Sequence, residues 1–247
     1  MYNIKTMSET VDLTAHGENP LFFLINLDCA TDRWEHFLNQ VHRFNTPIYV
    51  KRFSAIHGDT HKFTEEEQRL CENLDCRHQE YANRIKGNQL SHYYILKDIV
   101  KYKFPYAVVC QDDVVFRDDF IAKLTNVLKS IPKDAEMINI GFHKEAWLSH
   151  FAPWDFNDET FRTRHLKSFV NDHIGVISDD VNPCSLAYII TLQGAANMIE
   201  YFDRVGFLRA TDQNFNVYLS EKNIFYASNP VLCTGTTIFG SSIFLQE

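Results

Sequence analysis

Two adjacent acids, Asp112 and Asp113, preceded by Gln111, are the residues of this sequence best suited to chemistry. They directly follow an apolar run at 106–110, which is typical of a buried strand. Neighbouring carboxylates repel one another unless a cation or hydrogen bonds compensate their charge. Oxygen ligands of this kind suit Mg²⁺ or Mn²⁺ held against phosphates. A solvated acidic turn accounts for the same residues equally well.

A second polar ending, Asn26-Leu27-Asp28, closes another apolar run at 21–25. Continuous apolarity indicates strands buried on both faces, as in a parallel sheet. The carboxyl ends of such strands share one edge of the sheet, and ligands bind beyond that edge. We therefore expect the two polar endings to lie at one ligand site.

The other apolar patterns predict the elements that must position these residues. Expected strands are 21–25, 48–53, 106–110, 137–140 and 186–190, and expected helices are 31–44, 64–74, 90–102, 120–128, 192–202 and 211–221. Their alternation indicates an α/β fold with helices flanking a mostly parallel sheet. We expect a polar N-terminal leader over 1–20 and a single domain over 21–247. The pattern weakens between 141 and 183, which we interpret as an insertion.

Charge and hydropathy limit the classes of partner. The formal net charge is −8, so a nucleic-acid partner held through its phosphates is not expected. No stretch reaches the ~20 apolar residues that span a bilayer, and residues 1–20 contain no apolar run of signal-peptide length. The six cysteines are scattered and have no secretory context, which favours reduced thiols. We expect a cytoplasmic protein.

Several blocks of the sequence, taken in order, resemble glycosyltransferase family 25. This family contains transferases of lipopolysaccharide and lipooligosaccharide biosynthesis, and its relatives include collagen galactosyltransferases. Each block is unspecific by itself, but their order and spacing are specific. The blocks are Phe23–Asp28 with Thr31–Arg33, Arg52–Gly58, Gly87–His92 with Lys97, Tyr106–Val115, Ala187–Ile190 with Gly194 and Ala195, and Asp212.

The resemblance implies a GT-A type fold and inverting transfer of a hexose, galactose or glucose, from a UDP-sugar. It places Mn²⁺ or Mg²⁺ on Asp113, with Asp112 supporting the ion or touching the sugar. The cation would neutralise charge on the departing UDP. Gln111 departs from the family, which has an acid there, and its amide is suited to a ribose hydroxyl or to weak ligation of the cation through its carbonyl. We expect a weaker metal requirement or a lower metal affinity as a result.

The same resemblance places donor contacts on residues from several blocks. Asn26, Asp28 and Arg33 are expected near the uridine and diphosphate, although Arg33 also suits an ordinary surface ion pair. Ser91 and His92 are expected in the first turn of a helix, where free amides favour anions. A capping serine and a core histidine are the alternatives. Gly58 is expected in a turn where backbone approaches the donor.

Asp212 is the candidate general base for an inverting transfer, because it matches the family's late acid. The pair Thr211–Asp212 also suits an ordinary helix start. The acceptor implied is an oligosaccharide or lipid-linked saccharide, selected by the region 141–183, with peripheral contact at the cytoplasmic face of the inner membrane. Metal-assisted hydrolysis and a non-catalytic or metal-independent UDP-sugar-binding protein remain as alternatives.

Overall fold

We describe the fold from a computed structural model, which places residues 5–6, 20–44, 46, 48–76, 79–142, 165–178, 184–236 and 238–239. The helices are α1 (Thr31–Val41), α2 (Glu65–Leu70), α3 (Ala82–Tyr102), α4 (Phe120–Lys129), α7 (Leu192–Val205) and α8 (Thr211–Glu221), and a 3₁₀ turn spans Gln79–Tyr81. The strands are β1 (Lys5–Thr6), β2 (Leu21–Asn26), β3 (Tyr49–Ser54), β4 (Tyr106–Gln111), β5 (Val114–Phe116), β6 (Met137–Asn139), β7 (Gly141–Phe142), β8 (Leu166–Asn171), β9 (Ile174–Ile177), β10 (Ala187–Thr191), β11 (Tyr226–Ser228) and β12 (Cys233–Gly235).

Within the described residues, the main sheet has nine strands in the order β1-β3-β2-β4-β10-β6-β11-β9-β8. Strands β1, β3, β2 and β4 are mutually parallel, whereas β10 runs antiparallel to both of its neighbours, β4 and β6. Strand β11 pairs in parallel with β6. The carboxyl ends of β2, β3 and β4 therefore meet at one edge, as expected. The predicted α/β class is confirmed.

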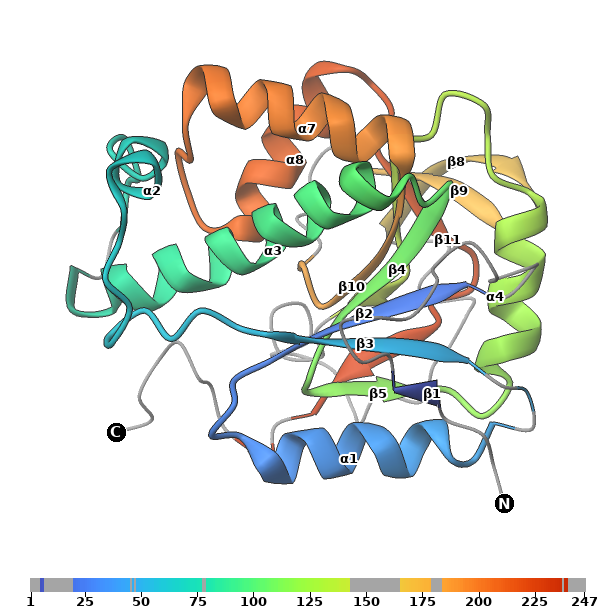
Figure 1. The fold of residues 1–247 in the computed structure, drawn as a ribbon. Helices are drawn as coiled ribbons and strands as arrows, with labels where there is room; N and C mark the ends of the chain where they lie inside the picture. Colours follow the sequence, from blue (N-terminus) through green and yellow to red (C-terminus); the bar gives the residue numbers. More distant parts are fainter. Residues whose placement is uncertain are drawn as a thin grey trace.

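Helices cover both faces of this sheet, and its central strands are therefore buried on both sides. All six residues of β2 are buried. Phe22 and Leu24 face the core that contains α1 and α4, whereas Phe23 and Ile25 face the core of α3, α7 and α8. Figure 1 shows α3, α7 and α8 above the sheet and α1 below it. Alternate residues of one apolar run thus bind the two helical layers.

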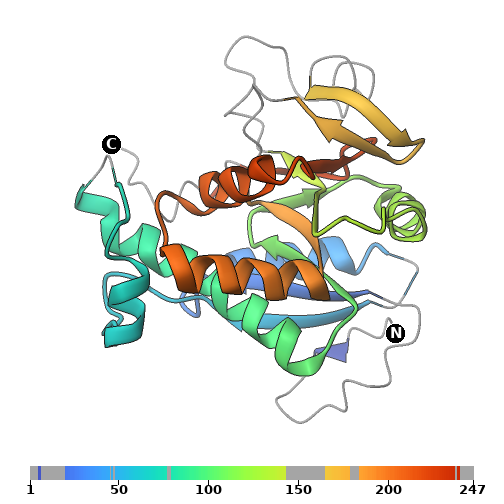
Figure 2. The same cartoon turned by 90° about the horizontal axis from the view of Figure 1, so that it is seen from above.

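The region 141–183, expected to be an insertion, contributes strands where it is described. Strands β8 and β9 form an antiparallel pair that joins the main sheet through β11. Figure 2 shows this pair, in yellow, at the end of the sheet far from the blue strands β2 and β3. Residues 143–164 and 179–183 lie outside the described residues. The proposed acceptor role of the region stays a prediction.

A second, smaller sheet was not predicted. It has the order β5-β12-β7 and begins immediately after the acid pair. Strand β12 runs antiparallel to β5 and parallel to β7. Strands of two or three residues leave too little periodicity for sequence analysis to detect.

Helix α3 begins at Ala82, eight residues before the expected start at residue 90. Gly87 lies inside this helix, at the point where the chain after β3 crosses it. A Cβ on Gly87 would lie 2.4 Å from the carbonyl oxygen of Ile56, and one on Gly58 would lie 1.8 Å from that of Asn83. The two glycines therefore permit close backbone contact, which required tertiary information.

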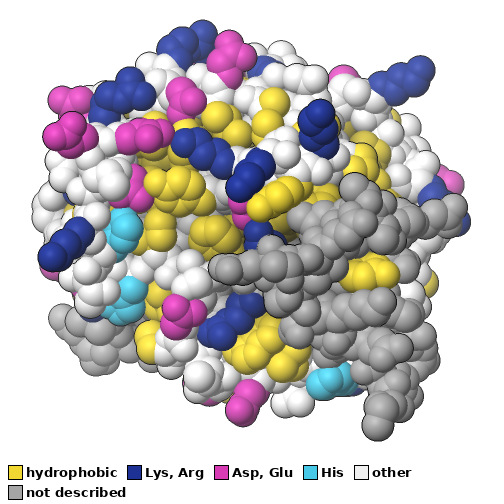
Figure 3. Space-filling view, in the orientation of Figure 1, with side chains coloured by type: hydrophobic (Ala, Val, Ile, Leu, Met, Phe, Trp, Pro, Cys, Tyr) yellow, Lys and Arg dark blue, Asp and Glu magenta, His cyan; other side chains and the backbone are white. Residues whose placement is uncertain are grey.

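Among the described residues, no helix is long and apolar enough to cross a membrane. Figure 3 shows basic and acidic side chains interspersed over the face that it presents.

We predict that Gly87→Ala lowers the free energy of unfolding by about 1–3 kcal/mol, because the added methyl overlaps the Ile56 carbonyl. On helix propensity alone the same change would stabilise by up to about 1 kcal/mol, so the sign separates the two effects. Urea unfolding measures it. Lys101→Ala, at the exposed end of the same helix, is the control and should change little. A stabilised Gly87→Ala protein would contradict the close contact.

Candidate active site

The Asp112 carboxylate forms the centre of a buried polar network at the end of β4. It is 8% exposed. One oxygen, Oδ2, accepts a hydrogen bond from Asn26 Nδ2 at 2.7 Å. The other, Oδ1, accepts from Arg33 Nη1 at 3.0 Å. The predicted meeting of the two polar strand endings is therefore observed, and both Asp112 oxygens are engaged by protein.

The network continues to β3 through Asn26, whose side chain is 1% exposed. Its Oδ1 accepts from Arg52 Nε at 2.8 Å, and Arg52 also approaches Asp28, with 3.9 Å between Nη2 and Oδ1. Asp28 Oδ2 accepts from Ser54 Oγ at 2.7 Å. Asn26 and Ser54 are partners in the parallel register of β2 and β3. The polar residues at the end of β2 are thus bonded to polar residues at the end of β3.

Arg52 and Ser54 are site residues that the sequence analysis did not single out. They lie in one of the family-like blocks, but nothing in their own spacing indicates a ligand site. The only available signal was their position, because both residues lie in the last three residues of β3, the strand that pairs with the strand of Asn26. Arg52 also lies over the Trp34 ring, 5.3 Å from its centroid, which fixes the guanidinium between α1 and the strand edge.

Burial raises the pKa of the Asp112 carboxyl above its ordinary value, and the neighbouring charge of Asp113 adds to this. The hydrogen bonds from Asn26 and Arg33 and the positive charge of Arg33 act in the opposite direction. Removing one partner from a buried charge pair exposes the full desolvation cost of the other. Arg33, 7% exposed, is therefore a buried counter-ion and not a surface ion pair, and its expected donor contact stays a prediction.

Asp113 follows at the turn between β4 and β5 and is half-buried. Its carbonyl oxygen accepts from the backbone N–H of Thr236 at 2.8 Å. Gln111 donates its amide to the Ser185 hydroxyl at 3.0 Å and to the Ser185 carbonyl at 3.3 Å. Gln111 is thus tied to the segment before β10, and its expected ribose contact stays a prediction.

The donor set suits a cation only when a substrate supplies further ligands. The described residues contain no group of three His, Cys, Asp or Glu side chains able to hold a metal ion. Asp112 has both oxygens engaged by Asn26 and Arg33, which favours a supporting role for it. Mg²⁺ and Mn²⁺ sites commonly use one or two carboxylates together with substrate phosphates. Asp113 fits such a site.

Ser91 and His92 do not lie in the first turn of a helix, and that prediction was wrong. They lie in the interior of α3, whose backbone amides there bond within the helix. Ser91 Oγ accepts from the Ile56 N–H at 2.9 Å and so holds the chain after β3. Neither residue has a free helix amide with which to bind an anion.

His92 is a buried core residue in this structure. It is 1% exposed, stacks on Tyr188 and shares a 2.8 Å hydrogen bond with the Tyr188 hydroxyl. Burial lowers the pKa of His92 to about 3, so the ring is neutral at pH 7. Donor contacts by His92, Ser91 and Gly58 stay predictions.

Asp212 lies in the first turn of α8, next to the end of α3 that faces the acid edge. Thr211 is the first residue of α8, as expected, and donates to Asn88 Oδ1 at 2.6 Å. Phe215 packs against His92 and Tyr188. These contacts bring the start of α8 to the edge where the chain after β3 crosses α3. Burial raises the pKa of Asp212 above its ordinary value.

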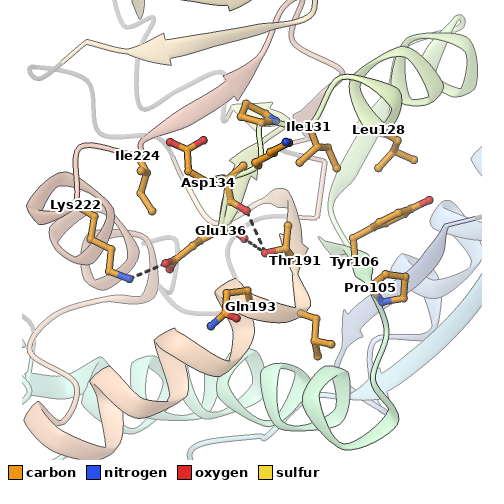
Figure 4. Close-up of a pocket in the computed structure, with 14 residues that line it drawn as sticks. Pro105, Tyr106, Leu128, Ile131, Asp134, Glu136, Thr191, Gln193, Lys222 and Ile224 are labelled. Carbon is orange, nitrogen blue, oxygen red and sulfur yellow. Dashed lines mark hydrogen bonds and ion pairs between the residues drawn. The ribbon is translucent and has the colours of Figure 1, made fainter.

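A cavity of about 850 Å³ opens at the opposite edge of the sheet (Figure 4). Its lining comes from the beginning of β4, the end of β10 and the loop before β6. Its buried acid, Glu136, already accepts from Lys222 Nζ and Asn197 Nδ2, both at 2.6 Å. Ligands bind beyond the carboxyl ends of parallel strands, and those of β2, β3 and β4 lie at the other edge, so we place the candidate site at the acid turn.

Comparison with known proteins identifies the family. The sequence profile of glycosyltransferase family 25 (LPS biosynthesis protein) matches residues 19–214, which include the acid turn and Asp212. This chain belongs to glycosyltransferase family 25. Mouse and human procollagen galactosyltransferase 2 are each 24% identical to it over 185 residues, or 72% of the chain. The alignment covers 27% of each relative, so the chain matches about a quarter of their length.

Two solved structures show a more distant likeness. Mouse xyloside xylosyltransferase 1, in its apo form, has a TM-score of 0.39 and 10% identity, covering 83% of this chain and 70% of its own. A glycosyltransferase involved in glycosylation of the major capsid of PBCV-1 has a TM-score of 0.41 and 10% identity, covering 91% and 94%.

We predict that Arg33→Met destabilises the family 25 chain by about 3–5 kcal/mol, because Asp112 would remain buried without its counter-ion. The double variant Arg33→Met/Asp112→Asn should lose less than the sum of the two single changes. Equilibrium unfolding in urea measures both. Arg43→Met is the matched control, since the Arg43–Asp118 pair is solvent-exposed at 3.8 Å, and its stability should not change measurably. Additive single effects would contradict a coupled buried pair.

Proposed function

We propose that this chain transfers a hexose from a UDP-sugar to a saccharide acceptor. The observation that supports the proposal most strongly is the position of Asp113 in a family 25 chain, in the turn at the carboxyl edge of β4. It lies beside Asp112, whose charge is compensated by Arg33 and Asn26. In a family 25 chain, this arrangement suits a donor diphosphate held with a divalent cation at Asp113.

The cation, Mn²⁺ or Mg²⁺, would supply charge neutralisation at the leaving diphosphate. The protein's part is to hold Asp113 in place and to compensate the charge of Asp112 beside it. Arg33 does so by donating to Asp112, and Asn26 fixes the second oxygen. Because these groups are buried and bonded, the turn is organised before any ligand arrives, which lowers the reorganisation needed on binding.

Asp28, Ser54 and Arg52 suit the nucleoside half of the donor. Asp28 and Ser54 are exposed at the same strand edge and already bonded to one another. Carboxylate and hydroxyl groups at this position match ribose hydroxyls, and the Arg52 guanidinium suits a carbonyl or phosphate oxygen. A UDP-sugar bound in this way extends from Asp28 towards Asp113, with its hexose, galactose or glucose, beyond the acid turn.

Asp212 is the proposed general base for an inverting mechanism. Its carboxylate would take the proton of the acceptor hydroxyl as that oxygen attacks the anomeric carbon, while UDP leaves from the opposite face. Oδ1 is oriented by the N–H of Gln213 at 2.9 Å. Burial raises its pKa, which moves the carboxylate towards the basicity that proton abstraction requires.

The acceptor proposed is an oligosaccharide or lipid-linked saccharide of lipopolysaccharide or lipooligosaccharide biosynthesis. This follows from the family's description as an LPS biosynthesis protein. Work on such an acceptor would take place in the cytoplasm, in peripheral contact with the inner membrane. Transfer to vesicle-bound compared with water-soluble acceptors tests that location, and equal rates on both would argue against it.

A metal-independent or non-catalytic UDP-sugar-binding protein is the second candidate. It is supported by Gln111, a neutral residue where the family has an acid, whose amide is already bonded to Ser185. The site would then carry one carboxylate fewer for a cation. UDP-sugar binding that persists in chelator, without transfer to any acceptor, would favour this candidate.

We predict that wild-type turnover requires Mn²⁺ or Mg²⁺, and that Asp113→Asn lowers kcat by about a hundredfold or more. A panel of UDP-sugars, assayed for UDP release with and without saccharide acceptors, measures this. Asp118→Asn is the control, because it removes the same charge from a solvent-exposed position five residues after Asp113. Full turnover in chelator would support the metal-independent alternative. Equal UDP release with and without acceptor would indicate hydrolysis.

We predict that Asp212→Asn lowers kcat by about a hundred- to ten-thousandfold while UDP affinity is retained. The base must be ionised, and burial raises its pKa. Wild-type kcat/KM should therefore rise with pH through a value above the ~3.9 of an ordinary Asp, and this limb should vanish in the variant. A pH–rate profile and calorimetric UDP titration measure the two effects. Near-normal turnover of Asp212→Asn would remove it from the mechanism.

A further inference from the structure

The chain near its C-terminus returns to the acid turn. Strand β12 pairs with β5, so that Gly235 lies opposite Val114, the residue that follows Asp113. Immediately afterwards, the Thr236 N–H donates to the Asp113 carbonyl at 2.8 Å. The turn carrying both acids is thus fixed on its β5 side by residues more than a hundred positions later in sequence. We call the described residues 233–236 and 238–239 the C-terminal strap.

The same strap also reaches the counter-ion of Asp112. The Phe239 ring lies under the Arg33 guanidinium, with 5.4 Å between Cζ and the ring centroid. The Phe239 carbonyl accepts from Arg33 Nη2 at 3.4 Å, while Nη1 of the same side chain donates to Asp112. His36, one turn further along α1, meets the ring edge-on at 5.2 Å. Phe239 therefore helps to fix the direction in which Arg33 points.

From these contacts we propose that the C-terminal strap is a positioning element for the acid turn, and that Phe239 acts through Arg33. The strap holds Asp113 through its backbone and Asp112 through the guanidinium that compensates it. Loss of the Phe239 ring would free Arg33 to take other rotamers and expose it to water, which weakens its bond to Asp112. The catalytic meaning of this positioning rests on the proposed function, but the positioning itself can be tested without it.

Hydrogen exchange of the ligand-free protein is the primary test. With Phe239→Ala, the amides of 112–116 should exchange about two- to thirtyfold faster, corresponding to the loss of one cation–π contact. Phe239→Leu keeps apolar volume without a ring face and should behave like Phe239→Ala, whereas Phe239→Trp should restore protection. Ile238→Ala is the matched control, because that neighbouring side chain is 72% exposed.

The second readout is UDP affinity in the presence of Mn²⁺, with KM and kcat for the donor. We expect Phe239→Ala to raise the dissociation constant for UDP and the KM for the donor, and Phe239→Leu to raise both by the same factor as Phe239→Ala. Unchanged exchange at 112–116 in both variants would overturn the inference. If wild-type protein binds no UDP while exchange still responds to Phe239, the proposed function fails and the positioning role stands.

Discussion

The buried bond between Arg33 and Asp112 is the interaction on which the rest of the candidate site depends. A carboxylate placed at the end of a central strand loses most of its hydration, and that cost must be offset within the protein. Arg33 supplies the opposite charge and Asn26 a second hydrogen bond. Each partner comes from a different element, so the sheet, α1 and the β4–β5 turn must all be in place before the charge is compensated.

This dependence separates the roles of two acids that are adjacent in sequence. Asp112 is directed inward to Asn26 and Arg33, and Asp113 is left in the half-buried turn beside it. In the proposed function, a cation and the donor diphosphate bind at this turn, next to the compensated charge of Asp112. At the opposite edge of the sheet, the buried acid Glu136 accepts from Lys222 and Asn197.

The sequence was sufficient to predict the sheet edge, but not the contacts across it. Continuous apolar runs correctly indicated β2 and β4, and their polar endings meet as expected. The expected start of α3, at residue 90, is too late, because Gly87 lies inside the helix, where its small size permits the crossing with the chain after β3. Arg33 could be read as a surface residue or a nucleotide contact, since its partner is 79 positions away. Strands β5 and β12 are too short to leave a periodic signal, so the contact of Phe239 with Arg33 required the structure.

We propose that a divalent cation and the donor diphosphate bind at Asp113 while Asp112 remains bonded to Arg33 and Asn26. A crystal structure of the protein with UDP and Mn²⁺, with anomalous data collected at the manganese edge, is the decisive measurement. We expect one anomalous peak within coordinating distance of the Asp113 carboxylate and of the UDP phosphates, with the Arg33–Asp112 bond intact. Manganese and UDP bound elsewhere, as in the cavity beside Glu136, or an Asp112 released from Arg33 to ligate the metal, would contradict it.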